Sequence, residues 1–466
     1  MAGALAAPCL VHRTSRVRLR LTLRQANRCY GLLRSAGDVW AWLLDANRER
    51  HRRGEPTVSN YQALCRELAR TRGFGELSSV GARSVLRRYA DAWFQAINRR
   101  NRGEKAHFPR RRKRALVPIR LYHGTFRIEG QRVRLPVAKG QPALWVRLAR
   151  PLPYSPERVR AVTLLAEGGQ LWLAVTAALP VDSHVLDPGR VAGVDLGIIH
   201  PYAVVTKTSG LLVSGRAIRA ENFLHLHDQQ VRQGRTGRRA PTPGERGSRR
   251  WRHHRVRVRR AEARHRRRIH QAQHQAAKQV IAFAIQHRIG TLVVGDPKGI
   301  TRRDAGRVHN LRLRQWRRMH LLQALRDKAE RAGMVVRLVD ERGTSSTCPV
   351  CRRRAPKPGS RGFRCEACGF HGHRDLVGAA NIAAKAGGGS TSISLPVLVE
   401  HRRAGIVPAR RDRRRHCYDQ RRRRSCLALG HPETATVASG CRSSGARALL
   451  APDEDQAAPS NRTDAA

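Results

Sequence analysis

Acidic residues are scarce in this chain of 466 residues. It has 34 Asp and Glu against 92 Lys and Arg, so its formal net charge is +58 and its pI is about 11.8. Such an excess of one sign destabilises a compact chain by self-repulsion, and nucleic acid is a polyanion that would neutralise it. A membrane surface or an arginine-rich genome would be plainer explanations. Because the arginines recur within segments that also carry periodic apolar residues, the distribution favours nucleic acid.

Long hydrophobic runs are also missing. No segment approaches the roughly 20 apolar residues that span a bilayer, so no membrane helix is expected. The first residues, MAGALAAPCLVH, are apolar but short, and no basic segment precedes them, which argues against a secretory signal. These features predict a cytosolic protein, and the charge predicts one associated with the bacterial nucleoid.

Cysteine is sparse and unevenly spaced. Of ten cysteines, six are scattered and four form two CxxC pairs with thirteen residues between them. This usage favours a metal site in a reducing compartment over a disulfide framework. Four thiolates so spaced suit one tetrahedral Zn²⁺ and predict a closed, structural zinc ribbon, with a redox dithiol or unused thiols as alternatives. The predicted ligands are Cys348, Cys351, Cys365 and Cys368. The next histidines, His371 and His373, are expected to be bystanders.

The spacing of apolar residues predicts an α+β multidomain protein. Alternating patterns predict a small β-barrel-like (wedge-like) unit, and apolar residues three and four apart predict a helical nucleic-acid-recognition lobe. Strand–helix–strand patterns predict an α/β core, with a polar loop at about 228–247 and a helix at about 308–332. The expected parts are the β-barrel unit (1–24 and 115–186), the helical lobe (25–114), the core (187–346) with a basic helix (248–287), the zinc ribbon (347–370), a final core segment (371–386) and a disordered basic tail (387–466).

Two carboxylates stand at positions typical of metal ligands. Asp195 follows an apolar strand in GVDLGIIHP, and Asp375 begins the small-residue helix of HRDLVGAANIAAKA, where a carboxylate also complements the helix dipole. Either residue alone would suit an ordinary cap or turn. A third apolar strand, in VVGDPKG, ends at Gly295, which has no side chain.

Together these segments resemble one family. VAGVDLGIIHPYAVVT, the arginine-rich helix, VVGDPKGI, LVDERGTSSTCPVC, CEACG and HRDLVGAANIA occur in this order, as in the RuvC-like nuclease core of the transposon-encoded TnpB/OrfB proteins, relatives of the compact type V CRISPR effectors. The resemblance covers about residues 187–386 and extends more weakly to HFPRRR. It implies an RNase H-like (RuvC) core interrupted by a zinc ribbon, a guide RNA from the transposon end, double-stranded target DNA and Mg²⁺.

The resemblance also implies catalytic roles for Asp195 and Asp375, but it fails at the second motif. The family's Glu falls on Gly295, and two positions around the third motif also differ, with His373 and Val377 in place of acidic and Asn residues. Two Mg²⁺ ions need several converging carboxylates. Some family members lose the second-motif Glu and supply one from a later region, which here points to Glu341 at the end of MVVRLVDE.

Three other possibilities stay open for the missing ligand. Asp340 and Asp296 are alternative carboxylates, although a shift of one strand position aims Asp296 at the opposite face. A nuclease-dead site is the third possibility.

The remaining candidate residues are expected to contact nucleic acid. The basic helix would follow guide RNA or the heteroduplex through phosphates, and the HFPRRR turn would also face nucleic acid. Trp251 suits base stacking or core packing equally. The candidates are Arg249, Arg250, Arg252, Arg255, Arg259, Phe108 and Arg110. The sequence thus predicts an RNA-guided DNA endonuclease using two Mg²⁺ ions, with a nuclease-dead RNA-guided DNA-binding protein or a transposase as alternatives.

Overall fold

The computed structural model describes residues 10–70, 73–110, 116–296, 306–356, 360–386 and 398–403, all within one compact unit, Met1–Val407. Its strands form a seven-stranded sheet, a six-stranded sheet and a two-stranded ribbon. Within the described ranges no helix is long and apolar enough to cross a membrane.

The seven-stranded sheet joins the start of the chain to residues that follow the first helices. Its order is β2-β6-β7-β1-β5-β4-β3, with two ends, so strand pairing in the described ranges does not close a barrel. β1 lies at its centre and pairs antiparallel with β7 and β5. The strands are β1 (Leu10–Arg20), β2 (Ile119–Tyr122), β3 (Arg127–Glu129), β4 (Arg132–Leu135), β5 (Leu144–Leu148), β6 (Val159–Glu167) and β7 (Gln170–Pro180), with a short 3-10 turn at Pro156–Arg158.

Three capped helices separate β1 from β2. They are α1 (Leu23–Arg52), α2 (Tyr61–Ala69) and α3 (Ser79–Asn101). Thr22 and Gln25 form a capping box at α1, while Asn60 and Ser78 cap the other two helices with side-chain oxygens, satisfying backbone N–H groups that a helix start leaves unpaired. Their apolar faces share one core with the seven-stranded sheet, in which Trp40 packs edge-on against Tyr89.

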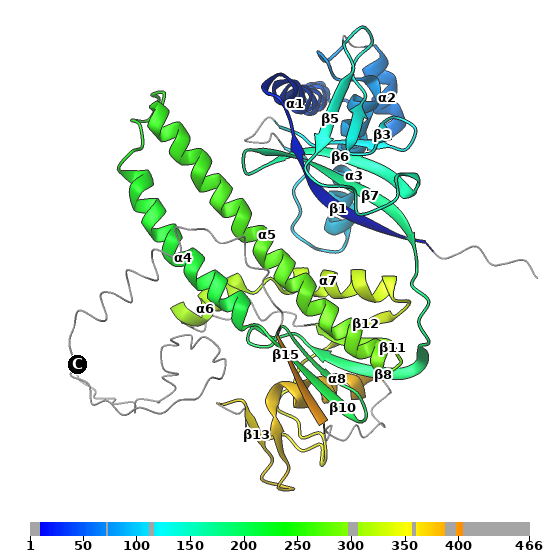
Figure 1. Cartoon of the computed structure of the whole chain (residues 1–466), viewed down its shortest axis with the longest axis vertical. Helices are drawn as coiled ribbons and strands as arrows, with labels where there is room; N and C mark the ends of the chain where they lie inside the picture. The colour runs from blue at the N-terminus through cyan, green and yellow to red at the C-terminus, as the bar shows by residue number, and fades with distance from the viewer. Residues whose placement is uncertain are drawn as a thin grey trace, which may run out of the picture. The chain divides into compact units, whose positions relative to one another are not determined.

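The six-stranded sheet carries the second half of the protein. Its order is β12-β11-β8-β9-β10-β15; β11 lies parallel to β8 and β12, whereas β8, β9 and β10 form an antiparallel meander. One face packs against α5 and α7, and the other packs against α8. Figure 1 shows these helices around the sheet. The elements are β8 (Asp187–Asp195), β9 (Tyr202–Val205), β10 (Ser209–Ser214), α5 (Arg249–Gln286), β11 (Ile289–Asp296), α6 (Arg307–Gln315), α7 (Arg318–Arg331), β12 (Val335–Asp340), α8 (Arg374–Ala386) and β15 (Leu398–Arg403).

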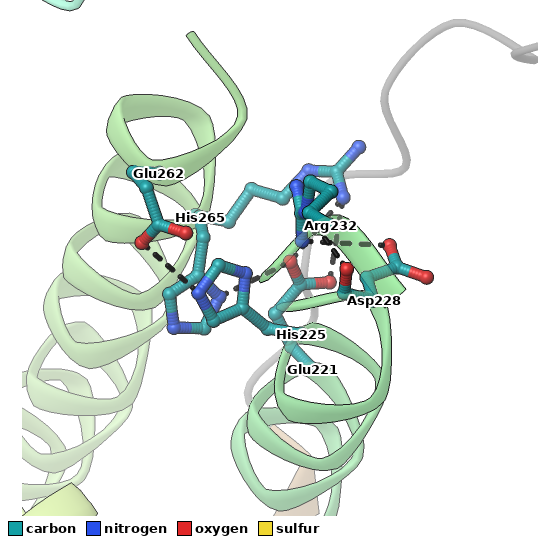
Figure 2. Close-up of polar contacts among 7 residues, drawn as sticks. Glu221, His225, Asp228, Arg232, Glu262 and His265 are labelled. Atoms are coloured by element: carbon teal, nitrogen blue, oxygen red, sulfur yellow. Dashed lines mark hydrogen bonds and ion pairs between the residues drawn. The ribbon is translucent and has the colours of Figure 1, made fainter. Parts of the chain in front are cut away.

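α4 (Arg216–Gly237) runs antiparallel to α5 and is attached to it by polar contacts (Figure 1). The stacked rings of His225 on α4 and His265 on α5 lie 3.7 Å apart (Figure 2). His225 Nε2 lies 3.2 Å from Glu262, and Arg268 donates to the buried Glu221 at 3.3 Å. The buried residue of α4 is Glu221, a charged residue, and not an apolar one. Polar contacts, and not apolar packing, therefore hold α4 against α5.

Three expectations from the sequence need correction. The polar loop expected at about 228–247 begins as helix, because α4 continues to Gly237 on the support of α5. The helix expected at about 308–332 is two helices, α6 and α7, separated at Trp316 and Arg317. Disorder throughout 387–466 is wrong for β15, which pairs in parallel with the open edge of β10; the rest of that range lies outside the described residues.

Candidate active site

Three neighbouring parallel strands end together at one edge of the six-stranded sheet. Val294 of β11 pairs with Val194 of β8, so Gly295 comes next to Asp195. On the other side Gly295 pairs with Val339 of β12, which places Glu341 just beyond the strand end. Since carboxyl ends of parallel strands meet at the same edge, the register brings a carboxylate to each side of the glycine.

Glu341 occupies the space above Gly295. A Cβ on Gly295 would lie 2.7 Å from Ile382 Cδ1 of α8, 2.9 Å from Glu341 Oε2 and 3.1 Å from the Glu341 Cβ, so a side chain at position 295 would require both neighbours to move. Glu341 Oε2 is buried and has no hydrogen-bond partner within the described ranges. A buried carboxylate oxygen without a donor is costly, and a cation would satisfy it.

α8 closes the site from the face of the sheet. A Cβ on Gly193 would stand 2.0 Å from the Ala379 carbonyl, so the absence of a side chain lets β8 and α8 pack backbone to backbone. Asp195 Oδ2 lies only 3.2 Å from where a Cβ of Gly378 would be, one helical turn after Asp375. The two glycines therefore bring Asp195 to the first turn of α8, where Asp375 lies.

The carboxylates of this edge interact electrostatically. Burial, with the charges of Glu341 and Asp375, raises the pKa of Asp195 to about 8. Burial, together with Asp296 and Asp340, raises the pKa of Glu341 to about 7. Two half-buried acids that resist ionisation without a counter-charge form an environment suited to divalent cations.

Asp375 differs because it already has side-chain hydrogen-bond partners. Its Oδ2 lies 2.8 Å from His200 Nδ1, and Arg361 donates to both of its oxygens at 3.0 Å. Burial favours a higher pKa, but the His200 hydrogen bond and the Arg361 charge outweigh it and hold the pKa of Asp375 below its ordinary value. His200, His373 and Asp375 have potential ligand atoms within 4.8 Å of one another; in the described ranges the three predicted catalytic carboxylates do not form such a group.

The alternative carboxylates have other partners. Asp296 forms a 3.9 Å ion pair with Arg318. Asp340 is more than half exposed and accepts a hydrogen bond from the Arg342 backbone N–H at 3.0 Å. Both nevertheless lie close enough to Glu341 to raise its pKa.

Two residues of α8 that sequence reasoning missed hold the segment around Glu341. Lys385 Nζ donates to the carbonyls of Asp340 and Arg342, at 2.7 and 2.9 Å. The buried Asn381 donates to the carbonyls of Thr344 and Thr347, at 2.7 and 2.8 Å. Asn381 could have been suspected of a hydrogen-bonding role because it is a single amide within the otherwise small and apolar run AANIAAKA. No comparable feature of the sequence pointed to Lys385.

The four predicted zinc ligands converge beside the short strands β13 (Gly362–Arg364) and β14 (His371–His373). Cys348 Sγ lies 3.6 Å from that of Cys368, and Cys351 Sγ lies 3.5 Å from that of Cys365. All four sulfur atoms lie within 4.8 Å of one another. Sulfurs on one tetrahedral Zn²⁺ are about 3.8 Å apart, given Zn–S bonds of about 2.3 Å, so the four thiols fit the ion.

The predicted nucleic-acid residues fall into two groups. The first group is exposed on α5: Arg249, Arg250, Arg252, Arg255 and Arg259. Arg110 is exposed as well, while Phe108 packs within the protein, stacked on Trp93 at 4.5 Å and covered by Arg100 at 4.2 Å. Trp251 is half-buried, with the Arg255 guanidinium 5.4 Å from its ring centroid.

Two family models match the segments of the chain that carry these carboxylates and cysteines. One family model, described as "Cas12f1-like, TNB domain", matches residues 319–382, and the OrfB_IS605 model, "Probable transposase", matches residues 174–301. Over these residues the chain resembles the TnpB/OrfB proteins and the compact Cas12f nucleases. The two matches lie on the half of the chain that carries the carboxylates and the four cysteines.

Two individual relatives of the chain are informative. "CRISPR-associated endodeoxyribonuclease Cas12f1" of Sulfoacidibacillus thermotolerans is 32% identical over 112 residues, which cover 24% of this chain and 25% of the relative. The match thus spans about a quarter of that curated protein. A "Cas12f1-sgRNA-target DNA complex" has a TM-score of 0.58 at 12% identity, covering 80% of this chain and 99% of that chain, and so shares the fold.

Proposed function

We propose that this chain is an RNA-guided, Mg²⁺-dependent DNA endonuclease with a rearranged RuvC-like site. The observation that carries the proposal is the position of Glu341, which fills the space above Gly295 beside Asp195. The family likeness supports the same function, because the named relative is an endodeoxyribonuclease and the similar structure holds a guide RNA and target DNA. Guide RNA and double-stranded target DNA are the partners proposed here, and the cytosolic nucleoid is the proposed location.

Asp195, Glu341 and Asp375 would hold the ions. Asp195 and Glu341 are half-buried and have raised pKa values, so both would ionise as cations bind. Two Mg²⁺ ions, when bound, supply an activated water and stabilise the leaving 3′ oxygen of the phosphodiester. Asp375 would exchange part of its contact with Arg361 for a metal ion, while Lys385 keeps the Glu341 backbone in place. The four cysteines would hold a structural Zn²⁺.

The exposed arginines of α5 would contact nucleic-acid phosphates. Their exposed guanidinium groups can pair with phosphate oxygens, which suits binding that follows the backbone and leaves sequence recognition to the guide. Phe108 is a weaker candidate for direct contact, because its ring already packs against Trp93 and Arg100.

A nuclease-inactive, RNA-guided DNA-binding protein is the second candidate. The observation that favours it is the pairing of Asp375 with His200 and Arg361, which satisfies that carboxylate without a metal ion. A transposase is favoured only by the description of one family model. A four-cysteine ribbon next to the site is the feature that argues for a guided nuclease over a strand-transfer enzyme.

The test uses the full chain with the RNA that copurifies with it. That RNA is sequenced, and a plasmid carrying the matching target is incubated with the complex in Mg²⁺. We expect cleavage that Asp195→Ala reduces by more than about 100-fold without loss of RNA binding, because one of the carboxylates that would hold the ions is removed. Binding of the target with no cleavage by the unaltered protein would establish the second candidate, and unchanged cleavage by Asp195→Ala would refute the metal site.

A further inference from the structure

Away from the carboxylates, three histidines gather where α5 meets α7. His270 and His274 lie one turn apart on α5, and their Nε2 atoms are 3.2 Å apart. His320 of α7 stands edge-on to His270, with ring centroids 6.4 Å apart. Two histidines at i and i+4 on one helix face are a recurring arrangement for binding Zn²⁺.

We propose that His270, His274 and His320 form a binding site for a divalent transition metal that joins α5 to α7. Two nitrogens bound to one tetrahedral Zn²⁺ lie about 3.3 Å apart, since each Zn–N bond is about 2.0–2.1 Å. The separation of 3.2 Å between the two Nε2 atoms on α5 meets this requirement without movement of the helix. Imidazole nitrogen selects ions such as Zn²⁺, Ni²⁺ and Co²⁺ over Mg²⁺.

The protonation state of the pair favours metal binding. Burial, followed by the charge of His270, lowers the pKa of His274 to about 4, and burial followed by His320 lowers the pKa of His270. Both shifts favour the neutral rings, the form of histidine that binds a metal ion. A hydrogen bond between the two Nε2 atoms requires one to donate and the other to accept, and an ion would replace that single bond with two.

The charges around the site set a limit on its affinity. Arg16, Arg317 and Lys328 lie near enough to lower the pKa of these histidines, and they would also repel a cation. Asp327 of α7 acts in the opposite direction on both rings and is oriented by Gln323, which donates to it at 2.7 Å. We therefore expect binding at micromolar metal concentrations.

One ligand must move to complete the site. The three histidines are not among the groups whose potential ligand atoms lie within 4.8 Å of one another in the described ranges. His320 is exposed, so its ring can turn toward the α5 pair without displacing core residues. α5 and α7 already pack on the same face of the sheet, so an ion here would fasten two neighbouring helices.

The test titrates Ni²⁺ into the full chain with the cysteine site already filled by Zn²⁺, followed by calorimetry. The unaltered protein should bind one more Ni²⁺ than the His270→Ala/His274→Ala variant, and His320→Ala should weaken that binding by roughly tenfold or more. Addition of Ni²⁺ should also slow amide exchange along Arg318–Arg331 in the unaltered protein. Because this binding is independent of DNA cleavage, failure of the nuclease proposal would leave its outcome unchanged.

Matched variants identify the ion's position. His253→Ala changes an exposed histidine on α5 outside the cluster and should bind Ni²⁺ as the unaltered protein does. His373→Ala removes a member of the His200 group and should also leave the extra ion in place. Equal Ni²⁺ binding by the double variant, with its helical circular dichroism intact, would overturn the proposal. Loss of the extra ion in His373→Ala instead would overturn it as well.

Discussion

At the scale of single residues, the side chain of Glu341 lies next to the position where a side chain at Gly295 would be. A glycine at the end of β11 removes a carboxylate, yet it also opens the space into which a side chain from the end of β12 fits. A Glu at both positions would bring the two side chains into steric and electrostatic conflict. The identities of these two residues are therefore coupled through one small volume.

The pKa of Asp195 gives a prediction about stability. Its folded-state pKa is about 8, against an ordinary value near 4, so between these pH values the folded chain binds a proton that the unfolded chain does not. The contribution of Asp195 to the free energy of unfolding therefore falls as pH rises across this window. Asp195→Asn cannot ionise, so at pH 8 and without Mg²⁺ it should be more stable than the unaltered protein, by at least about 1 kcal/mol.

Urea unfolding at pH 5 and pH 8 measures this effect. The advantage of Asp195→Asn should shrink at pH 5, where the unaltered carboxyl is already protonated. Asp38→Asn changes an exposed residue of α1 and should show no such pH dependence. An equal effect of Asp195→Asn at both pH values would mean that this carboxyl titrates normally.

At the scale of elements, α8 organises the site. It supplies Asp375 in its first turn and Lys385 in its last, so one helix touches both the edge that carries the carboxylates and the backbone on either side of Glu341. Gly193 and Gly378 permit the close approach of α8 and β8 on which this depends.

We predict that Lys385→Met slows cleavage by roughly 10–100-fold, the usual effect of removing a group that orients a metal ligand. The carbonyls of Asp340 and Arg342 would lose their donor, so Glu341 would be held less firmly, and a higher Mg²⁺ concentration should recover part of the rate. Cleavage rates measured against Mg²⁺ concentration test this. Lys207→Met, at an exposed lysine between β9 and β10, should cut normally; an identical Mg²⁺ dependence for Lys385→Met would exclude a positioning role.

The sequence predicted elements with a strong apolar periodicity well. It predicted poorly the elements that depend on contacts with the rest of the protein. α5 lies within one residue of its predicted limits because its apolar stripe continues over many turns. α4 and β15 were missed because their own residues carry little periodic signal: α4 depends on a polar network with α5, and β15 depends on the free edge of β10. The same distinction applies to the site: the motifs suggested Asp195 and Asp375 as candidates, whereas only the fold revealed Lys385 and the partners of Asp375.

At the scale of the whole molecule, the positive charge should act through particular segments. The arginines at the start of α5 are exposed, whereas Arg48, Arg52 and Arg53 on α1 are paired with Asp45 or Glu49. The carboxylate of an ion pair partly neutralises its arginine, so that arginine attracts a phosphate less strongly. The net charge of +58 therefore does not imply equal contributions from all basic residues.

We predict that replacing Arg249, Arg250 and Arg252 by Gln weakens RNA binding and lowers its salt dependence. For each phosphate of single-stranded RNA that the variant no longer neutralises, the slope of log K against log salt should decrease by about 0.7. Filter binding across a range of salt concentrations measures the slope. The matched triple change at Arg48, Arg52 and Arg53 should alter it less, and an equal decrease in both variants would point to a general charge effect.

The central claim is that Glu341 supplies the carboxylate missing at Gly295. The most direct measurement compares Mg²⁺-dependent cleavage of a matched plasmid by Glu341→Gly with that by Gly295→Glu/Glu341→Gly. We predict that the single variant loses cleavage while retaining RNA and target binding, and that the double variant regains part of it, because a carboxylate returns to the same space from β11. Cleavage by Glu341→Gly at the rate of the unaltered protein would contradict the claim.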